Sequence, residues 1–235
     1  MVERLPIGNA IETGKTFVLF VFSPAPGREF RFSERGPSPW RSVGIDARAG
    51  VADIVSGGGG ASESSAEWTV QLRLAKPCEL EFTYSGDGGT LVRESVFVDP
   101  AATEGQHRVD LPDGSVIERL PIGVAGGAYW LRFVRTRIPD SEIERYEAYD
   151  EEVDAALEEG DDQPDIDEPW PPPLERFITL RSEERQLRPQ NGGYTGGGRE
   201  QHFEVAVSTD QVTSDLEIIY RFDSGDVLVS ERFDL

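Results

Sequence analysis

The hexapeptide ERLPIG occurs twice in the chain, at residues 3–8 and again at 118–123. An identity of this length is improbable by chance in 235 residues, and it predicts that one fold is used twice. Three further pairs of similar segments follow in the same order: TFVLFVF (16–22) with AYWLRFV (128–134), VSGGGGASESSAEWTVQL (55–72) with PQNGGYTGGGREQHFEVAV (189–207), and LEFTYSGDGGTLVRE (80–94) with LEIIYRFDSGDVLVSE (216–231).

The offset between four pairs of matched residues increases along the chain, as a tandem duplication with insertions predicts. It is 115 for Glu3 and Glu118, 130 for Trp40 and Trp170, 135 for Trp68 and Phe203, and 136 for Leu80 and Leu216. The largest step includes a strongly acidic segment. We therefore predict a first copy at residues 1–115 and a second copy at 116–235, with an acidic insertion at 139–173.

Acidic residues are concentrated in this insertion. Residues 140–168 contain 15 acids and one base, Arg145, whereas the rest of the chain contains 29 acids and 22 bases. The segment thus supplies −14 of the total formal charge of −21. A chain adapted as a whole to high salt would carry the excess in both copies. The local excess favours a specific role for the segment, and salt adaptation is the alternative explanation of the overall charge.

Most of each copy has the residue pattern of β-strands. Short segments rich in β-branched and aromatic residues recur, among them EFRFS (29–33), EWTVQLRL (67–74), ELEFTYS (79–85) and LVRESVFV (91–98). The turns SGDGG (85–89) and DSG (223–225) and the Gly-rich stretches at 57–60 and 192–198 are predicted as loops between strands. The sequence predicts an all-β fold, a tandem duplicated antiparallel β-sandwich, whose copies form two sandwiches or one pseudo-symmetric body.

The acidic insertion is the main helical segment. Ser141 and Glu144 fit a capping box, and Gly160 is a plausible end. Apolar residues at helical spacing predict the inner face: Ile143, Tyr146, Val153 and Leu157, with Tyr149 and Ala156 beside them. Like charges four residues apart make such a helix marginal alone. The Pro-rich residues 161–173 after it are predicted to form an extended linker.

The composition argues against several classes of function. A charge of −21 repels nucleic acid and anionic membranes, whereas it attracts a basic protein. Cys78 is the only cysteine, so no internal disulfide forms, and this favours a reducing compartment. The apolar run FVLFVF (17–22) is too short for a membrane span. We expect a soluble, cytoplasmic protein.

The sequence contains no motif that predicts catalysis or the binding of a cofactor. GNAIETGKT (8–16) has five residues between its glycines where a phosphate-binding loop has four, and a β-like segment follows it. His107 and His202 are the only histidines, which is too few for a usual structural zinc site with one cysteine. We predict no enzyme activity, no cofactor and no metal, and calcium at 161–168 or at the acidic turns is the open alternative.

The acidic segment and its aromatic residues form the predicted binding site. Regularly spaced carboxylates speed encounter with a basic protein, and aromatic side chains supply the binding energy. The predicted partner-binding residues are Tyr146, Glu147, Tyr149, Asp150, Glu151, Glu152, Asp154, Glu158, Glu159, Asp161, Asp162 and Trp170. The competing interpretation is a solvated helix whose tyrosines pack on the sandwich.

The first copy resembles the competence-protein J family of DNA-entry nuclease inhibitors, which are small acidic β-sandwich proteins. The likeness covers roughly residues 17–115 and lies in Trp40, GIDARAGVADI (44–54), EWTVQLRL, LVRESVFV and HRVDLPDG (107–114). The aromatic residue that this pattern places after the LPDG turn is replaced by Ser115 and Val116. The resemblance implies a nuclease-inhibiting or immunity-type role and a structural role for Trp40.

These observations predict a non-catalytic acidic protein that binds a basic protein partner such as a nuclease or a toxin. The alternative is a salt-adapted structural or assembly domain, or a calcium-responsive one. The partner's identity and the oligomeric state do not follow from the sequence.

Overall fold

The computed structural model describes residues 1–23, 43–48, 52–61, 66–85, 91–158, 176–189, 191–195, 198–222 and 225–234. These residues form mostly β-strands in several antiparallel sheets, together with one long helix, α1 (Asp140–Glu158). The prediction of an antiparallel β-rich fold with a helix after the second ERLPIG segment is confirmed at this level. The predicted strand at 29–33 and Trp40 lie outside the described residues.

The chain divides into two compact units. Unit 1 contains Met1–Gln106 and Leu120–Trp130, and unit 2 contains His107–Arg119 and Leu131–Leu235. The chain therefore passes between the units more than once near the second ERLPIG segment. The predicted division into copies at 115 and 116 concerns the ancestry of the sequence, and it stays a prediction.

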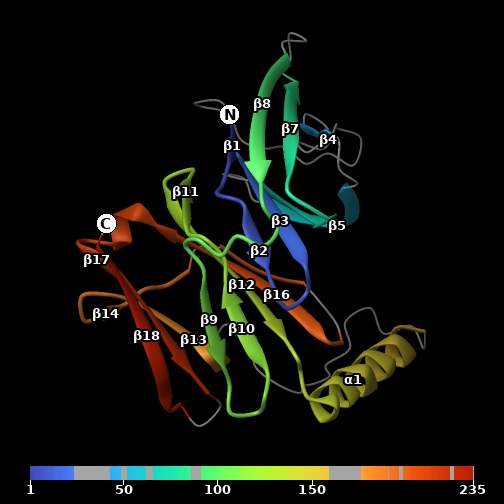
Figure 1. The fold of residues 1–235 in the computed structure, drawn as a ribbon. Helices are drawn as coiled ribbons and strands as arrows, with labels where there is room; N and C mark the ends of the chain where they lie inside the picture. The colour runs from blue at the N-terminus through green and yellow to red at the C-terminus, as the bar shows by residue number, and fades with distance from the viewer. Residues whose placement is uncertain are drawn as a thin grey trace. The chain divides into compact units, whose positions relative to one another are not determined.

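Unit 1 is built from two antiparallel sheets (Figure 1). The first has the order β1-β3-β6-β5, with β2 also on β3: β1 (Val2–Arg4), β2 (Gly8–Ala10), β3 (Lys15–Phe22), β5 (Ala52–Ala61) and β6 (Ala66–Leu74). The second has the order β4-β7-β8: β4 (Val43–Arg48), β7 (Cys78–Ser85) and β8 (Leu91–Val98). The short strand β11 (Gly123–Ala125) also belongs to this unit.

Alternating apolar side chains of the two sheets form the core of unit 1. Phe20 and Phe22 of β3 are buried with Leu80 and Phe82 of β7. Phe20 stacks on Trp68, with ring centroids 5.7 Å apart, and meets Phe82 edge to face. Burial of this continuous apolar layer between two sheets is the main stabilising term.

Unit 2 repeats the two-sheet plan. Its larger sheet has the order β15-β16-β12-β10-β9: β9 (His107–Asp110), β10 (Val116–Arg119), β12 (Ala128–Thr136), β15 (Asn191–Thr195) and β16 (Glu200–Ser208). The first residues of β12, up to Trp130, belong to unit 1, where β11 pairs with them. The other has the order β14-β13-β17-β18: β13 (Ile178–Ser182), β14 (Arg185–Gln186), β17 (Asp215–Arg221) and β18 (Val227–Asp234). A short 3₁₀ helix, Thr209–Gln211, precedes β17.

The register of the strands is the same around the two ERLPIG segments. In unit 1 Arg4 pairs with Phe20, and in unit 2 Arg119 pairs with Phe133. The two phenylalanines have matching surroundings. Phe20 lies 6.3 Å from the Tyr84 ring and Phe133 lies 6.4 Å from the Tyr220 ring, both edge to face.

An arginine, a glutamate and a tyrosine join the two sheets of unit 1. Arg4 forms an ion pair with Glu94, in which its Nε lies 3.2 Å from Oε2. The Tyr84 hydroxyl donates a hydrogen bond of 2.9 Å to the same carboxylate. The hydrogen bond from Arg4 lowers the pKa of Glu94, whereas burial and Glu94 itself raise the pKa of Tyr84.

Unit 2 contains the same three residue types in the same arrangement. Arg119 donates to Glu231 from Nε at 3.0 Å and from Nη2 at 2.7 Å, and the Tyr220 hydroxyl donates to Glu231 at 2.6 Å. Burial opposes ionisation of Glu231, but the hydrogen bonds from Arg119 and Tyr220 outweigh it and lower the pKa of Glu231. Burial raises the pKa of Tyr220. Bidentate arginine–carboxylate pairs of this kind fix geometry as well as adding stability.

The two ERLPIG segments contact each other reciprocally inside unit 1. A Cβ added at Gly8 would lie 2.7 Å from the Leu120 Cβ, and one added at Gly123 would lie 2.7 Å from Cδ2 of Leu5 and 2.7 Å from Cδ of Pro6. Each glycine therefore accepts the Leu-Pro pair of the other hexapeptide. Neither position has room for a side chain without a shift of its neighbour.

Residues 57–60 and 192–195 of the Gly-rich stretches lie in strands, so their prediction as loops was wrong. The glycines at 57–60 lie in β5 and pair with β6, and those at 192–193 lie in β15 and pair with β16. Each strand pairs on one side at the edge of its sheet. Backbone hydrogen bonds to one well-formed neighbour overcome the low strand propensity of glycine here.

Candidate functional site

The helix α1 begins directly after the turn that ends β12. The backbone amides of Glu142 and Ile143 both donate to the Pro139 carbonyl, at 2.9 and 3.2 Å, and so form the first turn. The helix starts at Asp140, one residue before the Ser141 of the predicted capping box, and ends at Glu158. In Figure 1 it extends away from the strands of unit 2.

Burial along α1 is concentrated in its first turn. Glu142 and Ile143 are buried, whereas every residue from 144 to 157 is half-buried or exposed. The half-buried positions are Tyr146, Tyr149, Val153 and Ala156, which follow helical spacing from Glu142. Leu157 has the predicted helical spacing, four residues after Val153, but it is 47% exposed near the end of the helix farthest along the chain from the buried first turn.

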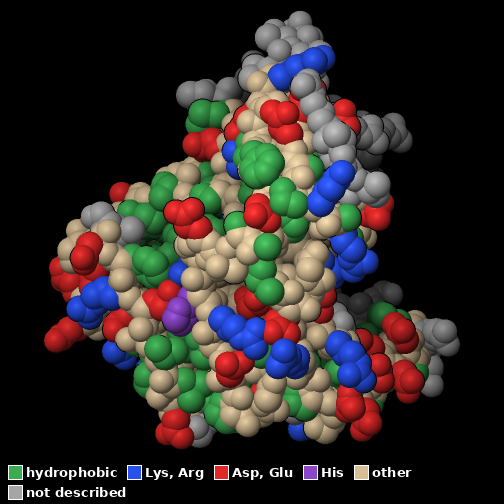
Figure 2. Space-filling model, viewed as in Figure 1, with side chains coloured by type: hydrophobic (Ala, Val, Ile, Leu, Met, Phe, Trp, Pro, Cys, Tyr) green, Lys and Arg blue, Asp and Glu red, His purple; other side chains and the backbone are tan. Residues whose placement is uncertain are grey.

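The predicted acidic residues that the structure describes lie on the outer face of α1. Glu147, Asp150, Glu151, Glu152 and Asp154 are exposed, and Tyr146 and Tyr149 are half-buried beside them. Figure 2 shows acidic side chains gathered over this helix, at the lower right. Glu158 is the last helical residue, and Glu159, Asp161, Asp162 and Trp170 lie outside the described residues. The structure thus brings eight of the predicted site residues onto one helix, Glu158 included.

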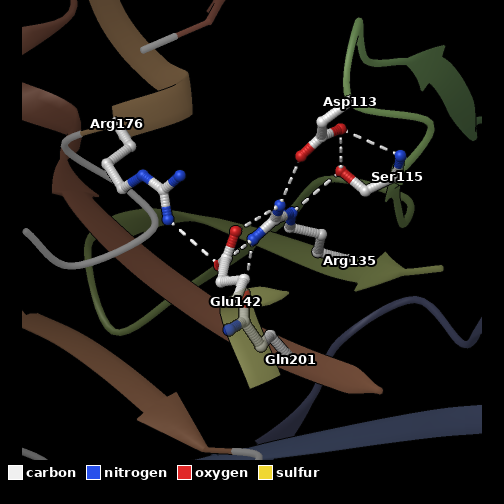
Figure 3. A network of polar contacts seen from close by, with 6 residues as sticks. All are labelled: Asp113, Ser115, Arg135, Glu142, Arg176 and Gln201. Carbon is white, nitrogen blue, oxygen red and sulfur yellow. Dashed lines mark hydrogen bonds and ion pairs between the residues drawn. The ribbon is translucent and has the colours of Figure 1, made fainter. Parts of the chain in front are cut away.

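One acid of the segment, Glu142, lies in a buried polar cluster (Figure 3). Its carboxylate accepts hydrogen bonds from Arg135, with Nη1 at 2.6 Å and Nη2 at 3.1 Å, and from Nη1 of Arg176 at 3.0 Å. The Arg135 side chain is completely buried and that of Glu142 is 6% exposed. Because both charges are removed from water, each requires the other.

The remaining donors of Arg135 also have partners. Nη2 donates to Asp113 at 2.8 Å, Nε donates to the Ser115 hydroxyl at 3.1 Å, and Nη1 is 3.2 Å from the Gln201 amide oxygen. Ser115 in turn donates to Asp113 from its hydroxyl and from its backbone amide. We call these residues the Glu142 cluster: Asp113, Ser115, Arg135, Glu142, Arg176 and Gln201.

The aromatic ring of Phe177 lies against both guanidinium groups of the cluster. The ring centroid is 4.5 Å from the Arg135 Cζ and 4.6 Å from the Arg176 Cζ. A guanidinium group can lie flat on an aromatic ring while its N–H groups donate to carboxylates. This arrangement stabilises its positive charge in a site without water. The two arginines also balance the charge of the two carboxylates. The cluster therefore stabilises the position of the first turn of α1, and its charged groups are paired with one another and not free for catalysis.

Sequence reasoning missed the Glu142 cluster. Arg135 lies two residues beyond Phe133 in β12, in the register of a core-facing side chain, and this was the available signal. Its partners Glu142 and Gln201 are 7 and 66 residues away in the sequence, so no local sequence pattern predicts these contacts.

The two histidines make ordinary contacts in unit 2. His107 lies 3.6 Å from Glu231, with its ring 5.5 Å from Tyr220, and His202 pairs with Glu200 two residues earlier. Among the described residues, no group of three or more His, Cys, Asp or Glu side chains is arranged to hold a metal ion. The acidic segment at 161–168 that was considered for calcium lies outside them. No helix in the described part is long and apolar enough to cross a bilayer.

Comparisons with known proteins leave the family of the chain open. No family model matches it, and no curated protein matches it. Among solved structures it is similar to the crystal structure of the conserved domain protein from Bacillus anthracis, with 8% identity and a TM-score of 0.29, over 100% of this chain and 87% of that one. A similarity this low carries no argument about function, which must be argued from the residues.

Proposed function

We propose that this protein is a non-catalytic acidic binding protein that engages a basic protein partner through the outer face of α1. The observation that carries the proposal is the difference in burial between the acidic residues of this helix. Glu142 is buried and paired inside the chain, whereas Glu147, Asp150, Glu151 and Glu152 are exposed. Exposed carboxylates gathered on one helix form a surface of strong negative potential.

The chemistry of this surface suits a cationic protein. A row of carboxylates raises the rate of encounter with a positive partner, and the effect decreases as salt screens it. Exposed ion pairs add little affinity individually. Tyr146 and Tyr149, half-buried beside the acids, would supply apolar contact area to the complex.

We also propose that the two units descend from a tandem duplication, and that the second copy gained the acidic segment. The matched elements support this. Both units have a long central strand paired with an ERLPIG segment, and both have the Arg–Glu–Tyr arrangement between sheets. The long helix follows the central strand of unit 2. On this proposal the helix is an addition to a frame that folds by its sheets.

The partner class follows from the resemblance of residues 17–115 to nuclease inhibitors. Nucleases that bind DNA present basic surfaces, and the negative face of α1 complements such a surface. We therefore propose inhibition of a basic nuclease or toxin in the cytoplasm as the role. Masking of a phosphate-binding surface needs no catalytic group in the inhibitor.

A capture experiment with two charge-matched variants tests the proposal. The first neutralises the helix: Glu147→Gln, Asp150→Asn, Glu151→Gln, Glu152→Gln and Asp154→Asn. The control makes the same changes at exposed acids elsewhere: Glu79→Gln, Glu104→Gln, Glu184→Gln, Asp53→Asn and Asp210→Asn. Both variants keep Glu142, so both should fold.

The expected result is recovery of a basic protein from cell extract by the unchanged chain and by the control variant, but not by the helix variant. The recovered protein should cleave nucleic acid less well in the presence of the unchanged chain. Equal recovery by all three proteins would reject α1 as the binding surface. Folding that requires molar salt, measured by circular dichroism, would favour the salt-adapted alternative.

A further inference from the structure

The Glu142 cluster ties together the two ends of the segment that contains α1. Arg135 lies in β12 before the helix, and Arg176 lies after the helix, two residues before β13. Both arginines donate to the same oxygen of Glu142, at 2.6 and 3.0 Å. The first turn of the helix is therefore held at the point where the chain leaves the sheets and returns to them.

The contacts become weaker beyond the first turn. Arg145 and Tyr146 in the next turn make further contacts, but from Glu147 to Leu157 no residue is buried. This outer part has a closely spaced row of carboxylates, and repulsion at i and i+4 destabilises an isolated helix of this kind. Helical structure in the outer part depends on continuation from a fixed first turn, since helix formation is cooperative.

We infer that Glu142 is the positioning residue of α1: its buried pairing with Arg135 and Arg176 fixes the direction of the helix and holds its outer part in helical form. Glu142 does not contact the partner. The inference rests on the proposed function in one respect, namely that the oriented acidic face is what the partner meets. A helix without this anchor would present the same charges without a fixed geometry, and binding would have to order it.

The inference separates Glu142 from the neighbouring acid Glu144. Both are glutamates in the first turns of α1, but Glu144 is exposed and Glu142 is not. Glu142→Gln keeps the shape and removes the charge that pairs with the two arginines. Glu144→Gln makes the same chemical change at the surface and is the matched control.

A second variant guards against general unfolding. Glu142→Gln alone leaves two buried guanidinium groups with the one carboxylate of Asp113. The double variant Glu142→Gln/Arg176→Gln removes one negative and one positive charge, so that Arg135 and Asp113 remain as a balanced pair. It breaks the anchor without leaving an excess buried charge.

Amide hydrogen exchange of the full chain measures the anchor without any partner. We expect the amides of 147–157 to exchange about tenfold faster or more in the double variant, while those of β17 keep their protection. Glu144→Gln should leave both regions within about twofold of the unchanged chain. Unchanged protection of 147–157 in the double variant would overturn the inference. Equal loss in β17 would also overturn it, because the cluster would then stabilise the whole unit and not the helix.

The same variants give a reading on the partner once one is captured. Released helix should weaken binding in the double variant mainly through slower formation of the complex, whereas Glu144→Gln has a small effect. This outcome and the exchange result are independent. If neutralising the outer face has no effect on binding, the proposed function fails, and the exchange experiment still decides the role of Glu142.

Discussion

The two units differ most clearly at the end of their central strands. Counting from Arg4 opposite Phe20 and from Arg119 opposite Phe133, the residues two positions further are Phe22 in unit 1 and Arg135 in unit 2. Phe22 is buried in the apolar core. Arg135 is equally buried but pairs with Glu142 and Asp113. The same position in the strand register is therefore occupied by an apolar core residue in unit 1. In unit 2 it is occupied by a buried arginine that pairs with a carboxylate of α1.

The comparison shows that two strand ends in the same register can hold the following chain in different ways. The chain leaves the sheet just after this position in both units, so a residue here controls the direction of the exit. An apolar side chain only closes the core. A buried arginine needs carboxylates, and one of those carboxylates comes from α1. The helix is therefore attached through the core and not merely through a surface loop.

Placing methionine at both positions should produce the largest difference. Arg135→Met leaves Glu142 and Asp113 without their main cation and should lower the free energy of unfolding by about 3–5 kcal/mol. Phe22→Met nearly conserves volume and should cost less than about 1.5 kcal/mol. Chemical denaturation measures both. Adding Glu142→Gln to Arg135→Met should recover part of the loss, and equal costs at the two positions would contradict the comparison.

The reciprocal glycines test the matched contacts of the ERLPIG segments. Gly8→Ala and Gly123→Ala each force a shift of the opposing Leu-Pro pair, and each should cost about 1–3 kcal/mol. The two costs should be similar, because the new Cβ at Gly8 meets the Cβ of Leu120 and the new Cβ at Gly123 meets the rigid Cδ of Pro6 as well as Cδ2 of Leu5. Thermal unfolding measures both costs. A large effect at one glycine with none at the other would show that the two contacts are not equivalent.

Acid sensitivity of the two Arg–Glu–Tyr arrangements should differ by a smaller amount. The pKa values of Glu94 and Glu231 are lowered in the folded chain, so each adds stability above the pKa of an unfolded glutamate and loses it as the pH falls through the folded value. The Glu231 side chain is 12% exposed and that of Glu94 is 38% exposed. Replacement of Glu231 by glutamine should therefore remove more of the acid-dependent loss than replacement of Glu94.

Denaturation of Glu231→Gln and Glu94→Gln at neutral pH and near pH 4 gives the comparison, with the unchanged chain as reference. We expect roughly 1 kcal/mol of difference or less between the two variants, since each carboxylate has hydrogen bonds to a charged group. If both variants lose stability in acid as steeply as the unchanged chain does, these pKa directions are contradicted.

The sequence was sufficient for the features that depend on local patterns. Alternation at Val70 and Leu72 predicted a strand with a buried face, and both residues are buried in β6. The capping box at Ser141 and Glu144 predicted the start of α1 to within two residues, since it placed the first helical residue at Glu142 and the helix begins at Asp140. The Gly-rich strands were missed because their pairing is supplied by a neighbour strand and not by their own side chains.

The anchor of the candidate site could not be predicted, for a physical reason. Glu142 looks like any other acid of a strongly acidic segment, and its burial is decided by Arg135, Arg176 and Gln201, which come from separate elements. The exposed acids were predicted as a group because charge density is a property of the sequence. Which member of the group points inward is a property of the fold.

The dependence of association rate on salt shows whether the negative face of α1 recognises the partner. With the captured basic protein immobilised, the unchanged chain and the control variant should associate more slowly as salt increases, with parallel slopes. The variant neutralised at Glu147, Asp150, Glu151, Glu152 and Asp154 should associate slowly at all salt concentrations with a nearly flat slope. A slope for this variant equal to that of the control would contradict the account, because the negative face of α1 would then play no part in recognition.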